Sequence, residues 1–282
     1  MPMKVITAIS DMQSLAESLR KEGKKIGFVP TMGYLHEGHL SLIRKAREEC
    51  DVLVASIFVN PTQFGPNEDL DRYPRDAEGD RKKCEASGVD ILFMPGAKDM
   101  YPEKPAVFVT VEGVSEILEG AVRPGHFRGV ATVVDKLFNI VKPHKSYFGQ
   151  KDFQQCVVIK RMARGLNMDV DVIVLPTMRE TDGLAMSSRN SYLNAEERRA
   201  ATVLFRALTA AHDLFLAESR EPEKLKNKMR AVVLKEPGIT IDYVEIADSE
   251  SLVPLSAASN SMVMLIAVRL GSTRLIDNML LP

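Results

Sequence analysis

Two histidines, His36 and His39, are the residues of this chain best suited to chemistry, and they flank the string Glu-Gly. Residues three apart share a face on the first turn of a helix. An imidazole pair there can hold phosphate oxygens as negative charge builds on them. A solvated pair in a loop and a metal site are the alternatives. The metalloprotease motif has two residues between its Glu and second His, whereas this string has one, and no cysteine stands nearby to complete a zinc set.

The residues around this pair predict a buried strand, a tight loop and a helix. An apolar run at residues 26–29 ends at Pro30, and residues 40–49 carry a helical pattern of apolar and polar positions. Gly33 and Gly38 lie between them and let the backbone turn close to a ligand. In open α/β sheets, ligands bind outside the carboxyl ends of the strands, where helix N-termini attract anions. The segment therefore predicts an anion or nucleotide site.

Two further candidates also follow predicted strands. Gln63 comes after the apolar run 51–59, and its amide suits a substrate with hydroxyl and carboxylate groups. The residues alone favour an ordinary turn there. Lys151 stands between a predicted strand at 145–148 and a helix at 153–164, where a bound phosphate is expected. An exposed surface lysine is the alternative.

Two polar segments complete the set of candidates. Ser187, Ser188 and Arg189 belong to a segment, residues 178–190, that lacks strand or helix periodicity. Two hydroxyls and a guanidinium in a row suit a triphosphate tail. A basic loop carries three possible cations, Arg123, His126 and Arg128. They either neutralise phosphates or belong to a solvated, mobile loop, and the role of Arg123 stays open.

The order of the patterns predicts an α/β protein: a Rossmann-like, doubly wound parallel sheet with a second, smaller α+β domain. The first domain is expected at residues 1–177 and the lid-like second domain at 178–282. Further elements are expected as a helix at 10–21 capped by Ser10 or Asp11, a helix at 130–141, strands at 88–95, 107–111 and 169–175, one long helix at 195–218, a helix at 222–234, and strands at 240–246, 262–270 and 273–278.

Composition excludes several classes of protein. The chain has 282 residues, is 45% hydrophobic and 27% charged, and carries a net charge of -1, so no basic surface for nucleic acid is expected. The apolar runs are strand-sized, and residues 1–11 lack the core of a signal peptide, so no membrane partner is expected. Three scattered cysteines favour a reducing cytoplasm: Cys50, Cys84 and Cys156.

The string His-x-Gly-His after a first strand resembles the signature of the class I aminoacyl-tRNA synthetase and nucleotidyltransferase superfamily. The longer string, residues 29–39, is similar to that of the pantothenate synthetase (pantoate–β-alanine ligase) family. Four more strings resemble that family in order, at residues 60–64, 119–130, 149–155 and 186–190, the last being similar to the superfamily's Lys-Met-Ser-Lys-Ser loop. Tyr34, a small or polar residue in many relatives, is a minor variation.

The resemblance implies an ATP-dependent ligase that condenses pantoate with β-alanine through a pantoyl adenylate, releasing AMP and pyrophosphate. It also implies Mg²⁺, a cytoplasmic location and a homodimer. His39, His36, Lys151 and Arg189 are expected to be catalytic, while Gln63 and Gln155 bind pantoate and β-alanine. No protein metal ligand is assigned. The expected ATP-binding residues are Met32, Gly33, Tyr34, Leu35, His36, Glu37, Gly38, His39, Gly149, Gln150, Lys151, Asp152, Met178, Met186, Ser187, Ser188 and Arg189.

Two rival functions remain. One is another adenylyl-transferring enzyme, such as one that moves AMP to a phosphate ester. The neutral amides Gln63 and Gln155 argue against it, since a phosphate ester calls for extra cations at those positions. The other is a nucleotide-binding sensor without turnover, and the presence of His39 and Lys151 argues against that.

Overall fold

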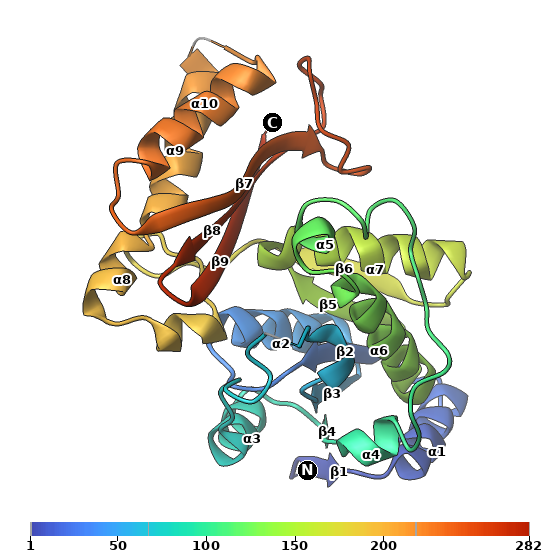
Figure 1. Cartoon of the computed structure of the whole chain (residues 1–282). Coiled ribbons are helices and arrows are strands. Elements are labelled where there is room, and N and C mark those ends of the chain that lie inside the picture. Colours follow the sequence, from blue (N-terminus) through green and yellow to red (C-terminus); the bar gives the residue numbers. More distant parts are fainter. Residues whose placement is uncertain (1, 67, 218, 282) are drawn as a thin grey trace. The chain divides into compact units, whose positions relative to one another are not determined.

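The computed structural model describes residues 2–66, 68–217 and 219–281. The chain divides into two compact units: Met1–Gly149 with Val158–Pro176, and Gln150–Val157 with Thr177–Pro282. Each unit has its own sheet (Figure 1) and its own hydrophobic core. The first sheet is parallel and six-stranded, and the second is antiparallel and three-stranded. This architecture confirms the predicted fold class. The assignment of separate roles to residues 1–177 and 178–282 stays a prediction.

The sheet of the first unit reverses its strand order at one place. Its strands, in spatial order, are β1 (Lys4–Ile6), β4 (Ile91–Phe93), β3 (Val52–Ile57), β2 (Ile26–Thr31), β5 (Lys145–Gly149) and β6 (Asp171–Leu175). From β2 the chain builds outward through β3 to β4, and then returns to the other side of β2 with β5. Such a switch point opens a crevice at the carboxyl ends of the two strands. The segments after β2 and β5 are therefore the ones that the topology directs to a ligand.

Helices cover this sheet in two groups. Helix α1 packs against α6, and α2 packs against α3, β2 and β5. The inner strands β2, β3 and β4 are nearly all buried, as expected for a parallel sheet covered on both faces, whereas the edge strands β1 and β6 are partly exposed. The helices with residues in this unit are α1 (Ile9–Lys21), α2 (Glu37–Glu49), α3 (Ala77–Ala86), α4 (Ala97–Met100), α5 (Glu119–Val122), α6 (His126–Val141) and α7 (Phe153–Gly165), the last of which begins within the second unit's short segment.

The second unit packs two helices onto its antiparallel sheet. The strands lie in the order β7 (Ile239–Asp248), β8 (Met262–Leu270) and β9 (Thr273–Leu281), and the helices are α8 (Ala195–Ala200), α9 (Val203–Ala217) and α10 (Pro222–Val233). Leu208, Met229 and Ile266 are fully buried between α9, α10 and the sheet. The alternating and apolar strand patterns thus predicted the correct elements here.

Four expectations about elements need correction. The strand β1 was not expected because three residues carry too little pattern. Residues 107–111 form no strand, and Val109 N–H donates to Thr132 Oγ1 on α6 (2.9 Å). Helix α1 begins at Ile9 without a side-chain cap, so neither Ser10 nor Asp11 caps it. The expected helix 195–218 is two helices, because Thr202 Oγ1 donates to the Arg199 carbonyl (2.8 Å) where the chain turns; residue 218 lies outside the described residues.

One stretch within the described residues, Ala195–Ala217, is long and apolar enough to cross a membrane by length and composition alone. A core helix of a globular protein passes the same test. Leu204, Leu208 and Phe215 of this stretch are buried in the core of the second unit. Packing against the sheet therefore accounts for its apolar side.

Candidate active site

The loop after β2 has an unusual backbone. Gly33 and Tyr34 are consecutive residues in the left-handed region, with φ of 85° and 53°. Thr31 Oγ1 donates to the Ser56 carbonyl (2.7 Å) and accepts the Gly33 N–H (3.2 Å). A Cβ on Gly33 would lie 3.0 Å from Asp80 Oδ2. Because glycine adopts this conformation without strain and tyrosine does not, the Tyr34 conformation needs outside support.

Asp80 on α3 supplies that support. Its side chain is 1% exposed. One carboxylate oxygen accepts the Tyr34 N–H (2.6 Å) and the other accepts the Leu35 N–H (2.7 Å). Lys83, one turn later, donates to the Leu35 carbonyl (2.7 Å). Charge-assisted bonds of this kind are among the stronger hydrogen bonds in proteins, so α3 fixes the path of the loop before it reaches the histidines.

The two histidines begin helix α2 together. His36 is the N-cap, so the helix starts at Glu37, three residues before its predicted start. His36 Nδ1 accepts the Gly38 N–H (3.1 Å), and the His36 N–H donates to Nδ1 of His39 (3.3 Å). The ring centroids are 4.2 Å apart. Since each Nδ1 is an acceptor, each neutral ring carries its proton on Nε2. The pair is thus set as two Nε2–H donors at a helix N-terminus.

Two other predicted residues lie at this edge of the first unit. Glu37 opens α2 and pairs with Arg44 on the helix surface. Gly149 is the last residue of β5. The residues of the first unit that are predicted to bind ATP, Met32 to His39 and Gly149, therefore lie at the carboxyl ends of β2 and β5, the two strands of the switch point.

Gln63 is held in one orientation beside Met32. It closes a short 3₁₀ turn, η1 (Pro61–Gln63), after β3 and is 8% exposed. Its Oε1 accepts from Asn60 Nδ2 (3.2 Å), and its Nε2 lies 3.2 Å from the sulfur of Met32. Tyr101 donates to Asn60 Oδ1 (2.9 Å), which sets the orientation of Asn60. The structure thus brings two predicted residues together and adds Asn60 and Tyr101, which no sequence signal marked beyond the polar strand end.

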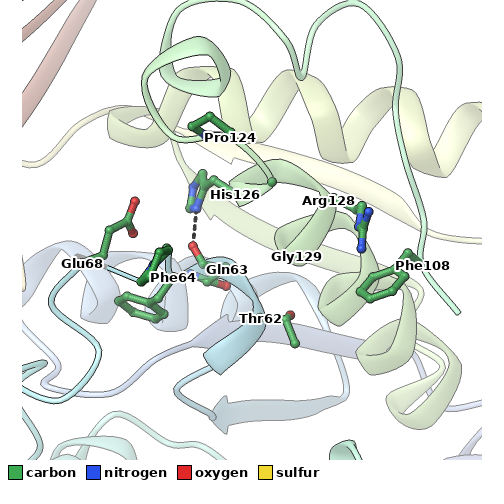
Figure 2. Close-up of a pocket in the computed structure, with 12 residues that line it drawn as sticks. Thr62, Gln63, Phe64, Glu68, Phe108, Pro124, His126, Arg128 and Gly129 are labelled. Atoms are coloured by element: carbon green, nitrogen blue, oxygen red, sulfur yellow. Dashed lines mark hydrogen bonds between the residues drawn. The ribbon is translucent and has the colours of Figure 1, made fainter. Parts of the chain in front are cut away.

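A second polar chain holds the backbone of Gln63. His126 Nδ1 lies 2.9 Å from the Gln63 carbonyl (Figure 2). Arg123 lies 3.1 Å from His126 Nε2. Burial, with the nearby Arg123 charge, lowers the pKa of His126 to about 4, so the ring is neutral near pH 7. Because arginine only donates, Nε2 accepts and Nδ1–H donates to Gln63. Arg123 also bonds Glu68 through two nitrogens (2.8 and 2.5 Å).

The contacts with His126 and Glu68 give Arg123 a role in positioning the backbone of Gln63, a role that the sequence left open. Burial would raise the pKa of Glu68, but its bonds with Arg123 hold that pKa below its ordinary value, so the pair is ionised. The idea that this basic segment neutralises phosphates stays a prediction.

A cavity of about 320 Å³ lies on the His126 side of Gln63. Figure 2 shows Arg128 on one wall, with its guanidinium over the ring of Phe108 (3.7 Å to the centroid), and Glu68 on another. Gly129 lets α6 approach η1 here, since a Cβ on it would lie 2.4 Å from the Thr62 carbonyl oxygen. The described lining of the cavity includes Gln63 and the candidate cations His126 and Arg128, but none of the residues predicted to bind ATP.

In the second unit, Gln150, Lys151 and Asp152 form a 3₁₀ turn, η2 (Gln150–Asp152), directly after β5. Lys151 Nζ lies 3.4 Å from Asp152 Oδ1. Helix α7 follows and carries Gln155, which is half-buried. Lys151 therefore precedes a helix N-terminus, as the sequence predicted.

The segment 178–190 is more regular than expected. Arg179 pairs with Ala185 in an antiparallel bridge, and the Met186 N–H donates to the Met178 carbonyl (2.9 Å), which makes a small hairpin. Ser187 then caps the 3₁₀ helix η3 (Ser188–Tyr192) by accepting the Arg189 N–H (3.3 Å). The serines and the arginine thus open a short helix.

No group of three or more His, Cys, Asp or Glu side chains within the described ranges is arranged to hold a metal ion.

Comparison with known proteins identifies the family. The sequence profile described as pantoate-beta-alanine ligase matches residues 4–280. The chain is 53% identical over 276 residues to the pantothenate synthetase of Caldicellulosiruptor saccharolyticus, covering 98% of both chains. It is 54% identical over 279 residues to that of Thermotoga petrophila, covering 99% of this chain and 100% of the relative.

Solved structures agree with this match. The pantothenate synthetase of Thermus thermophilus superposes with a TM-score of 0.93 at 46% identity, covering 98% of this chain and 99% of that one. The pantoate-beta-alanine ligase of Francisella tularensis, complexed with beta-gamma ATP and beta-alanine, superposes with a TM-score of 0.80 at 38% identity, covering 99% and 97%. With matches over nearly its whole length, the chain belongs to the pantoate–β-alanine ligase family.

Proposed function

We propose that this chain joins pantoate to β-alanine in two steps, with a pantoyl adenylate between them. The ligase activity and the use of ATP and β-alanine follow from family membership and from the ligand-bound Francisella relative. The observation that supports the adenylate route best is the histidine pair, whose Nδ1 atoms are both occupied by backbone N–H groups at the start of α2. Two Nε2–H donors at a helix N-terminus suit a phosphoryl group that gains charge.

In the first step, a carboxylate oxygen of pantoate attacks the α-phosphorus of ATP, and the bond to pyrophosphate breaks. A carboxylate is ionised near pH 7, so this step needs no strong base. It needs alignment and stabilisation of charge on the phosphoryl oxygens. In the second step, the amine of β-alanine attacks the acyl carbon, the acyl C–O bond breaks, and AMP leaves as the amide forms.

The roles of individual residues follow from their chemistry. His39 and His36 donate from Nε2 to the phosphate oxygens, with His39 nearest the departing group. Lys151 and Arg189 add positive charge, and Ser187 and Ser188 add hydroxyl donors. The remaining ATP contacts are proposed from the segments at residues 32–39, 149–152, 178 and 186.

Gln63 and Gln155 are proposed to hold pantoate. Asn60 occupies Oε1 of Gln63, which turns the Nε2–H donors toward Met32. Amide donors suit the carboxylate and hydroxyl oxygens of pantoate. For Gln155 the support is its half-buried place on the first turn of α7.

Mg²⁺ bound to the ATP phosphates would neutralise charge on the departing pyrophosphate. A homodimer is proposed from the family resemblance alone. A cytoplasmic location without a nucleic-acid or membrane partner is proposed from the cysteine pattern, the net charge of -1 and the short apolar runs.

The test is exchange of labelled pyrophosphate into ATP with pantoate and Mg²⁺ present and β-alanine left out. We expect exchange that depends on pantoate and that Gln63→Ala abolishes while ATP binding survives. Pantothenate formation without such exchange would overturn the free-standing first step. Full turnover by Gln63→Ala would overturn the assignment of Gln63.

A further inference from the structure

The last strand of the second unit reaches back to the turn that carries Lys151. Asn278 on β9 is 2% exposed. Its Nδ2 donates to the carbonyl oxygens of Gln150 and Lys151, both at 2.9 Å. Its Oδ1 accepts from Gln150 Nε2 at 3.1 Å. One buried amide thus makes three hydrogen bonds to a turn that precedes it by 127 or 128 residues in the chain.

The residue beside it holds the other predicted nucleotide segment of this unit. Asp277 is also 2% exposed, and its two oxygens accept from Arg179 at 2.6 and 3.0 Å. Arg179 donates further to the Gly183 carbonyl (3.1 Å), across the small hairpin that leads to Ser187. The Asn278 N–H donates to Asp277 Oδ1 (2.8 Å), which links the two contacts.

The chemistry of each side chain matches its partner. Two main-chain carbonyls need a donor with two N–H groups, which the amide of Asn278 supplies. The half-buried Arg179 guanidinium meets a bidentate acceptor in the buried Asp277 carboxylate. A buried amide such as that of Asn278 is costly without partners, so the η2 turn has one favourable position relative to β9.

From this geometry we propose that Asn278 is a positioning residue for Lys151, and that β9 sets the spacing between the Lys151 turn and the hairpin before Ser187. Asn278 acts through the main chain of residues 150 and 151 and does not touch the substrates. This inference rests on the proposed phosphate-binding role of Lys151. A small displacement of a reacting or charge-stabilising group lowers rates strongly, by up to about 100-fold per ångström.

The test is a double-mutant cycle measured by pantoate-dependent pyrophosphate exchange. Asn278→Ala, Lys151→Ala and the double variant are compared with the parent chain, with kcat and the KM values for ATP and pantoate determined for each. We expect Asn278→Ala alone to lower kcat about 10- to 100-fold. In the Lys151→Ala background the same change should lower kcat no more than about threefold, because residues acting as a unit are non-additive. Asn260→Ala, an exposed asparagine of the same unit, is the matched control.

The outcomes distinguish a failure of the positioning role of Asn278 from a failure of the proposed role of Lys151. An equal loss from Asn278→Ala in both backgrounds would overturn the positioning role and leave Asn278 as a general packing residue. Parent-like kcat in Asn278→Ala would overturn it as well. Parent-like kcat in Lys151→Ala would instead overturn the proposed function of Lys151.

A second variant keeps the test informative if Asn278→Ala does not fold. Asn278→Asp has nearly the same shape but cannot donate, and it sets negative charge against two carbonyl oxygens. Hydrogen exchange of the amides at residues 150–153 should rise about tenfold or more in this variant, with the β8 amides unchanged. Unchanged exchange at residues 150–153 would contradict the proposed contact.

Discussion

The loop after β2 and the turn after β5 follow neighbouring strands, yet they are held by opposite chemistry. Asp80 fixes the first by accepting two main-chain N–H groups, and Asn278 fixes the second by donating to two main-chain carbonyls. Asp80 is on α3 of the first unit, 45 or 46 residues after the loop that it holds. Asn278 is on the last strand of the chain, 127 or 128 residues after the turn that it holds. We call Asp80 and Asn278, with the main-chain groups they bond, the two clamps. Each clamp is a buried side chain, and replacing Asp80 by Asn or Asn278 by Asp would set like hydrogen-bonding groups against each other.

The largest effect on activity is expected from Asp80→Asn. The new amide sets an NH₂ group against a main-chain N–H of Tyr34 or Leu35, and Tyr34 loses the support for its left-handed backbone. We expect a loss of about 1–3 kcal/mol in the free energy of unfolding, as for a buried donor left unpaired, and about 100-fold slower pyrophosphate exchange. Thermal unfolding and the exchange assay measure both. Asp71→Asn, an exposed acid of the same unit, is the control, and a parent-like Asp80→Asn would refute the clamp.

The next substitution, Gly129→Ala, is expected to affect pantoate binding and to leave ATP binding nearly unchanged. In Gly129→Ala the new Cβ would lie 2.4 Å from the Thr62 carbonyl oxygen and 2.7 Å from Gln63 Cα, so η1 must move. We expect the KM for pantoate to rise about tenfold or more, since displaced contacts weaken ground-state binding, with little change in the KM for ATP. Gly165→Ala has open space around its Cβ and serves as the control. Equal changes in the KM values for pantoate and ATP would argue against a pantoate-binding role of η1 that is separate from ATP binding.

A smaller effect comes from acid. Burial lowers the pKa of His126 from 6.5 to about 4, so between these values the unfolded chain binds more protons than the folded one. The free energy of unfolding therefore falls as the pH drops from 6.5 toward 4. Denaturant titrations across this range should show the slope, and His126→Asn should flatten it. A slope unchanged by that substitution would place the acid sensitivity elsewhere.

The last comparison concerns stability alone and sets two ion pairs at the second unit's hairpin against each other. Asp182 pairs with Arg198 at the surface, with side chains 45% and 31% exposed, whereas Asp277 and Arg179 form a buried pair. Arg198→Ala should lower the free energy of unfolding by less than about 1 kcal/mol. Arg179→Ala leaves the buried Asp277 carboxylate without its cationic partner and should lower the free energy of unfolding by about 3–5 kcal/mol. Equal losses in chemical denaturation would contradict the distinction between the two pairs.

Sequence patterns predicted the local parts of this molecule well. The strand predicted at 262–270 has those bounds, the run 26–29 lies within β2, and the helix predicted at 40–49 exists but begins three residues earlier, at Glu37. Residues 107–111 also alternate but form no strand, and the Val109 N–H donates to the Thr132 side chain on α6. Periodicity reports which faces of an element are apolar and does not report whether a neighbour is present to pair with it.

The clamps were beyond sequence reasoning for a related reason. Asp80 sits in an ordinary charged helix, and Asn278 sits in a strand of mixed polar and apolar residues, so neither has a distinctive spacing. Their partners lie 45 to 128 residues away in the chain. Motif strings mark residues that meet the substrate. The residues that hold those motifs in place are determined by tertiary packing.

The most direct test of the proposed chemistry follows one oxygen atom. Pantoate labelled with ¹⁸O in its carboxylate is converted with ATP, β-alanine and Mg²⁺, and the AMP is examined by mass spectrometry. Attack on the α-phosphorus followed by acyl C–O cleavage predicts one ¹⁸O atom in AMP and one in the pantothenate amide. Unlabelled AMP, with the label in inorganic phosphate or water, would contradict the pantoyl adenylate.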